Sequence, residues 1–137
     1  MSPDLERKIV ARWPDWFDVH GDLRRTLMPH GFQCGDGWFD LVRRLCERLE
    51  PLVTELSTAL PDGDRFEVLE IKQKMGSLRF YVSHHHAAID TEIDGARLDS
   101  LRTCENCGSP GMLRNRDGWL VTVCDECLQG GGLKPQN

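Results

Sequence analysis

Residues 103–128, TCENCGSPGMLRNRDGWLVTVCDECL, carry two Cys-x-x-Cys pairs near the end of a chain of 137 residues. Sixteen residues separate Cys107 from Cys124, a spacing typical of two knuckles that bind one metal ion. Between the pairs, MLR and WLVTV have the composition of strands, and NRDG has that of a tight turn. A hairpin would carry the second pair back beside the first. The stretch therefore predicts a zinc ribbon.

The four thiols of this ribbon are the candidate metal ligands. Thiolates at tetrahedral corners suit a structural Zn²⁺ ion, so we expect one zinc bound by the set Cys104, Cys107, Cys124 and Cys127. Iron in a rubredoxin-like site is the lesser metal alternative, and disulfides or free thiols remain open. Four cysteine ligands leave no position for water, so the ion is expected to be structural. The few apolar residues of the ribbon would not offset its ordering entropy without the ion.

A second hairpin is predicted upstream, in FEVLEIKQKMGSLRFYVS (residues 66–83). With Met75-Gly76 as a two-residue turn, the apolar and polar side chains separate onto opposite faces. The pairs expected from this register are Lys74 with Ser77, Gln73 with Leu78, Ile71 with Phe80, and Leu69 with Val82. The inward face would hold Leu69, Ile71, Leu78, Phe80 and Val82, and the outward face Glu70, Lys72, Lys74, Arg79 and Tyr81. Phe66 and Val68 fall out of phase, which predicts a bulge.

Three helices are expected to complete an α+β fold. The first begins at Ser2-Pro3 and ends at Pro14. The second is long, with Asp36-Gly37 as its cap and a kink or division at Pro51. The third covers about 86–101 and docks on the hairpin, and a further short helix is possible over Asp22–Met28. The domain organisation predicted is residues 1–102 as an α+β domain of helices and a central hairpin, 103–128 as the zinc ribbon, and 129–137 as a disordered tail.

Composition narrows the class of protein. The chain has 17 basic and 22 acidic residues, a net charge of −5, and no basic tail or block, so whole-molecule attraction to nucleic acid is not supported. No apolar run is long enough to span a membrane, and no export signal precedes the six cysteines. Reduced thiols in a cytoplasmic protein, with no membrane partner, are therefore expected.

Nucleic acid is the alternative partner, because basic side chains gather on the outward face of the predicted hairpin. The outward strip of the hairpin, Lys72, Lys74, Arg79 and Tyr81, could hold phosphates and stack a base, or could be an ordinary solvated strand face. Arg114 and Arg116 of the ribbon would extend this strip.

The remaining histidines and cysteines do not indicate a further functional site. The run His84, His85 and His86 does not place three rings on one face, which favours an exposed loop and helix start over a metal site. Cys34 and Cys46 have no partner at motif spacing and are expected to be buried free thiols.

Several motifs appear together in one order: GDGW (35–38), KMGSLRFY (74–81), CENCGSPG (104–111) and GWLVTVCDEC (118–127). The set resembles a group of small uncharacterised zinc-ribbon proteins of phages, prophages and bacteria, over roughly residues 30–128. The resemblance implies a phage-type context and does not indicate a particular chemical activity. Met75 and Ser77 depart from the Phe and Gly of the group.

These observations lead to one functional expectation and two alternatives. No enzyme motif is present, so catalytic residues are not assigned. We expect a non-enzymatic, zinc-stabilised module that binds a protein, and the resemblance suggests an accessory role such as inhibition of a host defence complex. A zinc-ribbon nucleic-acid-binding protein that uses the hairpin strip is the alternative, and an enzyme with an unrecognised site is a distant third.

Overall fold

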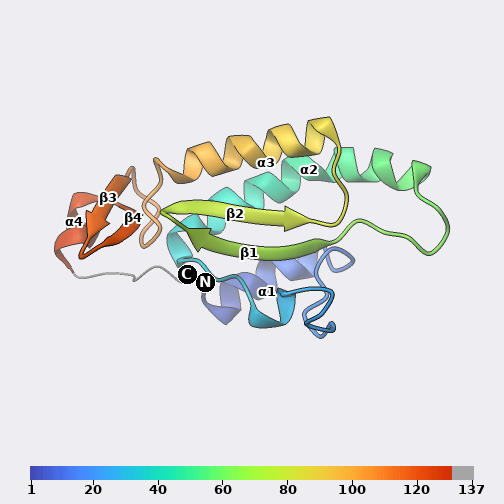
Figure 1. Cartoon of the computed structure of the whole chain (residues 1–137), viewed down its shortest axis with the longest axis horizontal. Coiled ribbons are helices and arrows are strands. Elements are labelled where there is room, and N and C mark those ends of the chain that lie inside the picture. Colours follow the sequence, from blue (N-terminus) through green and yellow to red (C-terminus); the bar gives the residue numbers. More distant parts are fainter. Residues whose placement is uncertain (131–137) are drawn as a thin grey trace.

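The computed structural model describes residues 1–130, which form four α-helices, two short 3-10 helices and two small antiparallel sheets. The elements in chain order are α1 (Pro3–Arg12), η1 (Met28–His30), η2 (Asp36–Trp38), α2 (Phe39–Ala59), β1 (Val68–Lys74), β2 (Ser77–Val82), α3 (Ala87–Ser100), β3 (Met112–Arg116), β4 (Trp119–Val123) and α4 (Asp125–Gln129). In Figure 1, the β1–β2 hairpin lies at the centre, with α3 and α2 on one side, α1 on the other and the ribbon at one end. The expected α+β class, with a C-terminal zinc-ribbon-like module, is confirmed.

The β1–β2 hairpin has the predicted turn and most of the predicted register. Lys74 lies opposite Ser77, and Ile71 lies opposite Phe80. Met75 and Gly76 both have positive φ, 55° and 81°, as a two-residue turn between twisted strands requires. The inner face buries Ile71, Leu78, Phe80 and Val82 as expected, and also Gln73.

The predicted pair of Leu69 with Val82 is wrong. A bulge between Val68 and Glu70 places Val68 opposite Val82, and it leaves Leu69 as the extra residue. Val68 is therefore the buried member, whereas Leu69 is half-buried. The carbonyl of Leu69 turns away from β2 and accepts a hydrogen bond from the N–H of Leu27 at 2.8 Å. The bulge that the sequence predicted thus changes which residue faces the core.

The irregular segment 13–35 covers the outer edge of β1. The N–H of Val68 donates to the carbonyl of Trp16 at 2.8 Å, and the N–H of Gln33 donates to the carbonyl of Ile71 at 2.9 Å. The N–H of Gln73 returns a bond to the carbonyl of Gln33 at 2.9 Å. The short helix that was possible over Asp22–Met28 does not form. The chain makes one hydrogen-bonded turn at Asp22 and the 3-10 turn η1 from Met28, and the Leu27 N–H bonds to the edge of β1.

One long helix, α2, supports the core. It runs for 21 residues through Pro51, so the division into two helices does not occur. Pro51 lies on the exposed face, where the lost N–H costs one hydrogen bond, while Leu49 and Val53 hold the buried face. Asp36 does not cap this helix with its side chain, and its Oδ1 accepts instead from the N–H of Ser2 at 2.6 Å.

The third helix matches its prediction closely. It begins after His86 and ends at Ser100, and Ile89 and Ala96 are buried in the same core as the hairpin. Leu101 is only half-buried and ends the helix. The predicted disordered tail is wrong at residue 129, because α4 includes Gln129. The rest of the tail prediction, from residue 131 onward, lies outside the described residues.

Candidate metal centre and its surroundings

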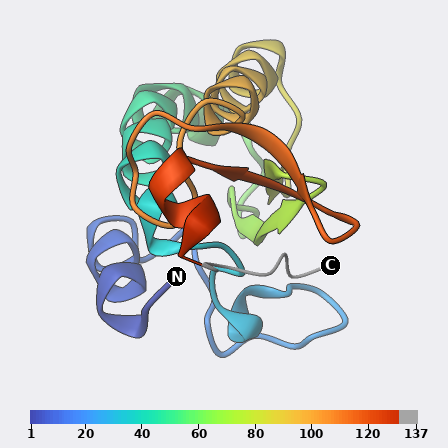
Figure 2. The ribbon, with the colours of Figure 1, turned by 90° about the vertical axis from the view of Figure 1, so that its left-hand side faces the viewer.

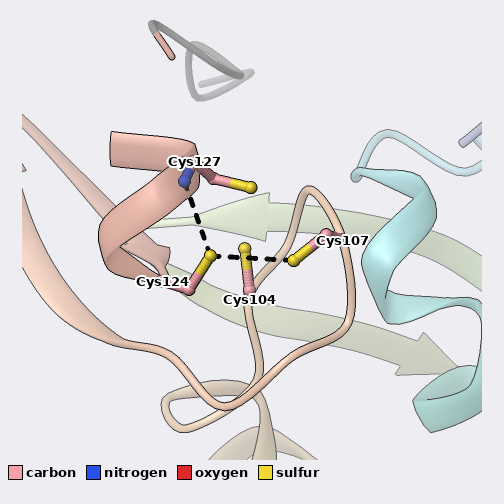
Figure 3. A group of neighbouring side chains, drawn as sticks. All are labelled: Cys104, Cys107, Cys124 and Cys127. Atoms are coloured by element: carbon pink, nitrogen blue, oxygen red, sulfur yellow. Dashed lines mark hydrogen bonds between the residues drawn. The ribbon is translucent and has the colours of Figure 1, made fainter. Parts of the chain in front are cut away.

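Four cysteine sulfurs converge between the two ends of the ribbon hairpin. Cys104 and Cys107 lie in the loop before β3, Cys124 follows β4, and Cys127 lies in α4. Their Sγ atoms all lie within 4.8 Å of one another, and Figure 3 shows the four side chains pointing toward one centre. Cys107 Sγ and Cys124 Sγ are 3.7 Å apart. This is the cluster that the sequence predicted.

The first knuckle is closed by its own backbone. The N–H of Gly108 donates to the carbonyl of Cys104 at 2.9 Å, and the N–H of Cys104 donates to the carbonyl of Ser109 at 2.7 Å. Gly108 has a φ of +82°, which lets the chain reverse directly after Cys107. The backbone of the loop alone therefore holds both sulfurs on one side.

The second knuckle uses the start of α4. Cys124 is the residue before the helix, and its Sγ accepts a hydrogen bond from the N–H of Cys127 at 3.5 Å. Asn106, from the first knuckle, donates its amide N–H to Cys127 Sγ at 3.2 Å. N–H groups aimed at sulfur stabilise thiolates, so Asn106 of the first knuckle supports a ligand of the second.

The pKa values of the thiols fit a site that needs a cation. Hydrogen bonds from the side chain and backbone of Ser109 lower the pKa of Cys107 to about 6. The Asn106 amide favours the thiolate of Cys127, but desolvation and the neighbouring sulfurs together raise the pKa of Cys127 to about 12. Four thiols at this separation ionise together only if a positive ion neutralises them. The donor set therefore fits a thiophilic metal ion with four sulfur ligands.

The GDGW segment joins the first knuckle to the main body, a role that the sequence did not reveal. The N–H of Gly37 donates to the carbonyl of Glu105 at 2.8 Å, and the N–H of Gly35 donates to the Glu105 carboxylate at 2.9 Å. Trp38, which is fully buried, donates its indole N–H to the carbonyl of Thr103 at 2.8 Å. Trp38 anchors this segment in the hydrophobic core. The only feature of the sequence that indicates this contact is the pair of glycines near Trp38, because they leave room for another backbone to approach.

A second joint lies at the turn of the β1–β2 hairpin. Thr122 Oγ1 donates to the carbonyl of Gly76 at 2.7 Å, and Gln73 Nε2 donates to the carbonyl of Leu120 at 3.3 Å. Viewed from the ribbon end, β3, β4 and α4 lie in front of this hairpin (Figure 2). These two hydrogen bonds and the contacts of the GDGW segment thus hold the ribbon against the main body.

The candidate binding residues divide into two groups. Lys72, Arg79 and Tyr81 lie together on the outer face of the hairpin, where Lys72 Nζ is 5.8 Å from the centre of the Tyr81 ring and 3.3 Å from the Glu70 carboxylate. Lys74 is exposed beside the turn.

The two ribbon arginines have structural partners instead of joining the strip. Arg114 forms an ion pair with Asp125, and the guanidinium of Arg116 donates to the carbonyl of Cys127 at 3.0 Å. Both contacts fasten α4 to β3. The predicted six-residue group is therefore not one surface.

The remaining candidates have local roles. His84 contacts Ser83 and Asp64, His85 contacts Asp90, and His86 caps α3 by accepting from the N–H of Ala88 at 3.3 Å. The three rings do not converge on one site among the residues described. Cys34 and Cys46 are buried free thiols, as expected, and burial raises the pKa of both.

Comparison of the chain with protein-family models, with curated proteins and with solved structures found no match. None of the helices within residues 1–130 combines the length and the apolar character that a membrane span needs.

Proposed function

We propose that the protein is a non-enzymatic binding module, that a structural zinc ion stabilises its fold, and that it engages a protein partner in the cytoplasm. The observation that carries this proposal is the convergence of four cysteine sulfurs, all within 4.8 Å of one another. Zinc suits four thiolates in tetrahedral geometry, and iron is the lesser alternative. The reducing cytoplasm keeps such thiols available for metal.

The architecture around the cluster supports a structural ion over a catalytic one. Four sulfur ligands complete a tetrahedral shell, so no position remains where water or substrate could be activated. The ion would also fix two joints at once, because Cys104 and Cys107 flank the Glu105 contact with Gly37, and Cys124 follows the strand that carries Thr122. An ion in this position would therefore hold the ribbon in a defined orientation on the main body.

A protein partner is favoured over nucleic acid by charge and by the engagement of the local cations. The chain has a net charge of −5, which repels phosphate at long range. Of the six candidate residues, Arg114 and Arg116 hold α4, and Lys72 contacts Glu70. The resemblance to small phage-type proteins favours an accessory role, such as inhibition of a host defence complex.

The nucleic-acid alternative rests on the open face of the hairpin. Lys74 is exposed, Tyr81 is 43% exposed, and Arg79 forms no ion pair within residues 1–130. Three cations and one aromatic ring on a strand face suit single-stranded nucleic acid.

A binding experiment with one double variant separates these two proposals. Lys72→Ala/Lys74→Ala removes two cations from the open face and leaves the core unchanged. If the partner is a protein, capture from a host lysate treated with nuclease should be the same for the variant and the parent. Micromolar or tighter binding to labelled DNA or RNA at physiological salt would contradict the proposal. The nucleic-acid reading would gain support if the variant also reduced the salt dependence of that binding by roughly one unit of slope for each lost contact.

A further inference from the structure

The second edge of the β1–β2 sheet has no strand partner in the part of the chain that is described. The main-chain groups of Ile71 and Gln73 in β1 point away from β2, as their hydrogen bonds to the backbone of Gln33 show. In an antiparallel pair, opposite residues point their main-chain groups in or out together. Phe80 lies opposite Ile71, and Leu78 lies opposite Gln73. The main-chain groups of Leu78 and Phe80 therefore point outward, away from β1.

The same alternation extends to the end of β2. The N–H of Ser83 bonds to the carbonyl of Glu67 at 2.9 Å, so Ser83 points toward β1 and Val82 points outward. One of these outward groups is capped: the N–H of Leu78 donates to Ser100 Oγ at 2.9 Å. The carbonyl of Leu78 and both main-chain groups of Phe80 and Val82 have no hydrogen-bond partner within residues 1–130.

A groove of about 250 Å³ runs along this edge. All five residues from Leu78 to Val82 line one wall, and α3 forms the other with Ile93, Asp94 and Arg97 among its residues. Leu78, Phe80 and Val82 are themselves no more than 5% exposed. Unpaired main-chain groups at such buried positions are costly unless water or a ligand bonds to them, and the groove is where either can reach them.

We propose that this groove binds an extended peptide segment of the protein partner, which adds to the sheet as a third strand beside β2. This inference rests on the proposed function, in which the partner is a protein. An extended chain offers alternating N–H and C=O groups at the repeat of β2 itself, and strand addition is a common mode of peptide recognition. The wall from Leu78 to Val82 sets the bound length at about five residues.

The side chains around the groove specify the ligand further. Ligand residues opposite Phe80 would point to the inner face, toward Ile93, and should be apolar. Of the charged residues that line the groove, Arg97 pairs with Asp94 and His85 pairs with Asp90. Arg79 has no ion pair or hydrogen bond within the described chain, and its Nε is buried without a partner. An acidic ligand residue opposite Arg79, on the outer face, would complement it.

Peptide selection followed by backbone methylation tests the proposal. A displayed library of random decapeptides is selected on the zinc-loaded full-length protein, and the tightest peptide is synthesised with each amide N-methylated in turn. If the peptide is a third strand, methylation should weaken binding at every second position, because alternate amides face β2. Hydrogen exchange should also slow at the Phe80 and Val82 amides when the peptide binds. The selected sequences should be apolar at alternate positions and acidic at one position between them.

A pair of charge reversals tests the role of Arg79. Arg79→Glu should weaken the selected peptide roughly tenfold, because a complementary cross-strand charge becomes a repulsive one. Arg44→Glu is the matched control: Arg44 is exposed on α2, outside the groove, and should leave the dissociation constant within about twofold. Circular dichroism of both variants checks that the fold is retained.

Three results would overturn the inference. The first is a peptide whose methylation pattern lacks the two-residue period, or one that protects amides elsewhere. The second is failure to select any peptide. The third is protection of Phe80 and Val82 by self-association at high protein concentration, which would make a second copy the occupant. In each case the broader proposal of a protein partner is judged separately, by the nuclease-resistant capture.

Discussion

At the scale of single residues, the junction between the ribbon and the main body depends most on Gly37. A methyl group at this position would lie 2.2 Å from the carbonyl oxygen of Cys104 and 2.6 Å from the nitrogen of Gly108. Both obstacles are backbone atoms of the metal knuckle, so neither can move without disturbing the cysteines. Gly37→Ala should therefore destabilise the protein by about 3 kcal/mol, and should do so by separating the ribbon from the main body.

The matched control for this substitution is Gly95→Ala. Gly95 lies inside α3, and beyond the adjoining backbone of its own helix no heavy atom lies within 4 Å of the added carbon, so alanine should be neutral or stabilise by up to about 1 kcal/mol. Urea denaturation of the two variants gives the comparison. Equal midpoints would show that the contact between GDGW and the knuckle is not close-packed.

Glu105 gives a prediction on pH dependence. Burial raises the pKa of its carboxyl above the usual value, although hydrogen bonds from Gly35 and Gln73 act in the opposite direction. The folded protein therefore holds this proton more tightly than the unfolded chain, so this group stabilises the fold less as the pH rises above about 4.5.

Glu105→Gln should remove that dependence and keep an acceptor for the N–H of Gly35. The stability of the variant relative to the parent should then increase as the pH rises from 5 toward neutrality. Urea midpoints measured at constant zinc across this range provide the test. A difference between variant and parent that does not change with pH would refute the burial argument.

At the scale of elements, the β1–β2 turn contains an unfavourable backbone conformation that a substitution can relieve. Met75 has a φ of 55°, a left-handed conformation that disfavours an ordinary side chain, and it is 54% exposed. Met75→Asn should stabilise the hairpin by about 0.5–1 kcal/mol, because asparagine accepts this conformation and few contacts are lost. Thermal unfolding measures the gain. An unchanged or lower midpoint would indicate that Met75 makes a contact of its own.

The elements also show how far the sequence predicts the fold. Periodicity located β1, β2, α2 and α3, because each repeats its apolar residues at the period of its geometry. It assigned Leu69 to the core in place of Val68, because a bulge between Val68 and Glu70 shifts the register by one residue. The β-edge role of residues 16–33 left no periodic signal, since those bonds involve backbone atoms.

At the scale of the whole molecule, the metal cluster was predictable and its attachment was not. The two Cys-x-x-Cys pairs encode the ligands by spacing alone, and the four sulfurs converge as expected. Arg114 and Arg116 were expected on a binding surface, but they fasten α4 to β3. Sequence gives the charge of a side chain, whereas its availability to a partner depends on which groups the fold places beside it.

For the whole molecule, we expect one metal ion, held by four cysteines, to stabilise the ribbon and its junction with the main body. Elemental analysis of protein purified without chelator should find one zinc per chain. Removal of the ion by a chelator should abolish amide protection in β3 and β4, and should weaken protection at Gly37, whose N–H bonds to the first knuckle. Cys124→Ser should have the same effect, and Cys46→Ser, at a buried cysteine outside the cluster, should retain the zinc.

The same exchange measurement can contradict the claim directly. Protein without stoichiometric metal, or a ribbon whose amides stay protected after complete chelation, would show that the four cysteines do not stabilise the fold through a bound ion.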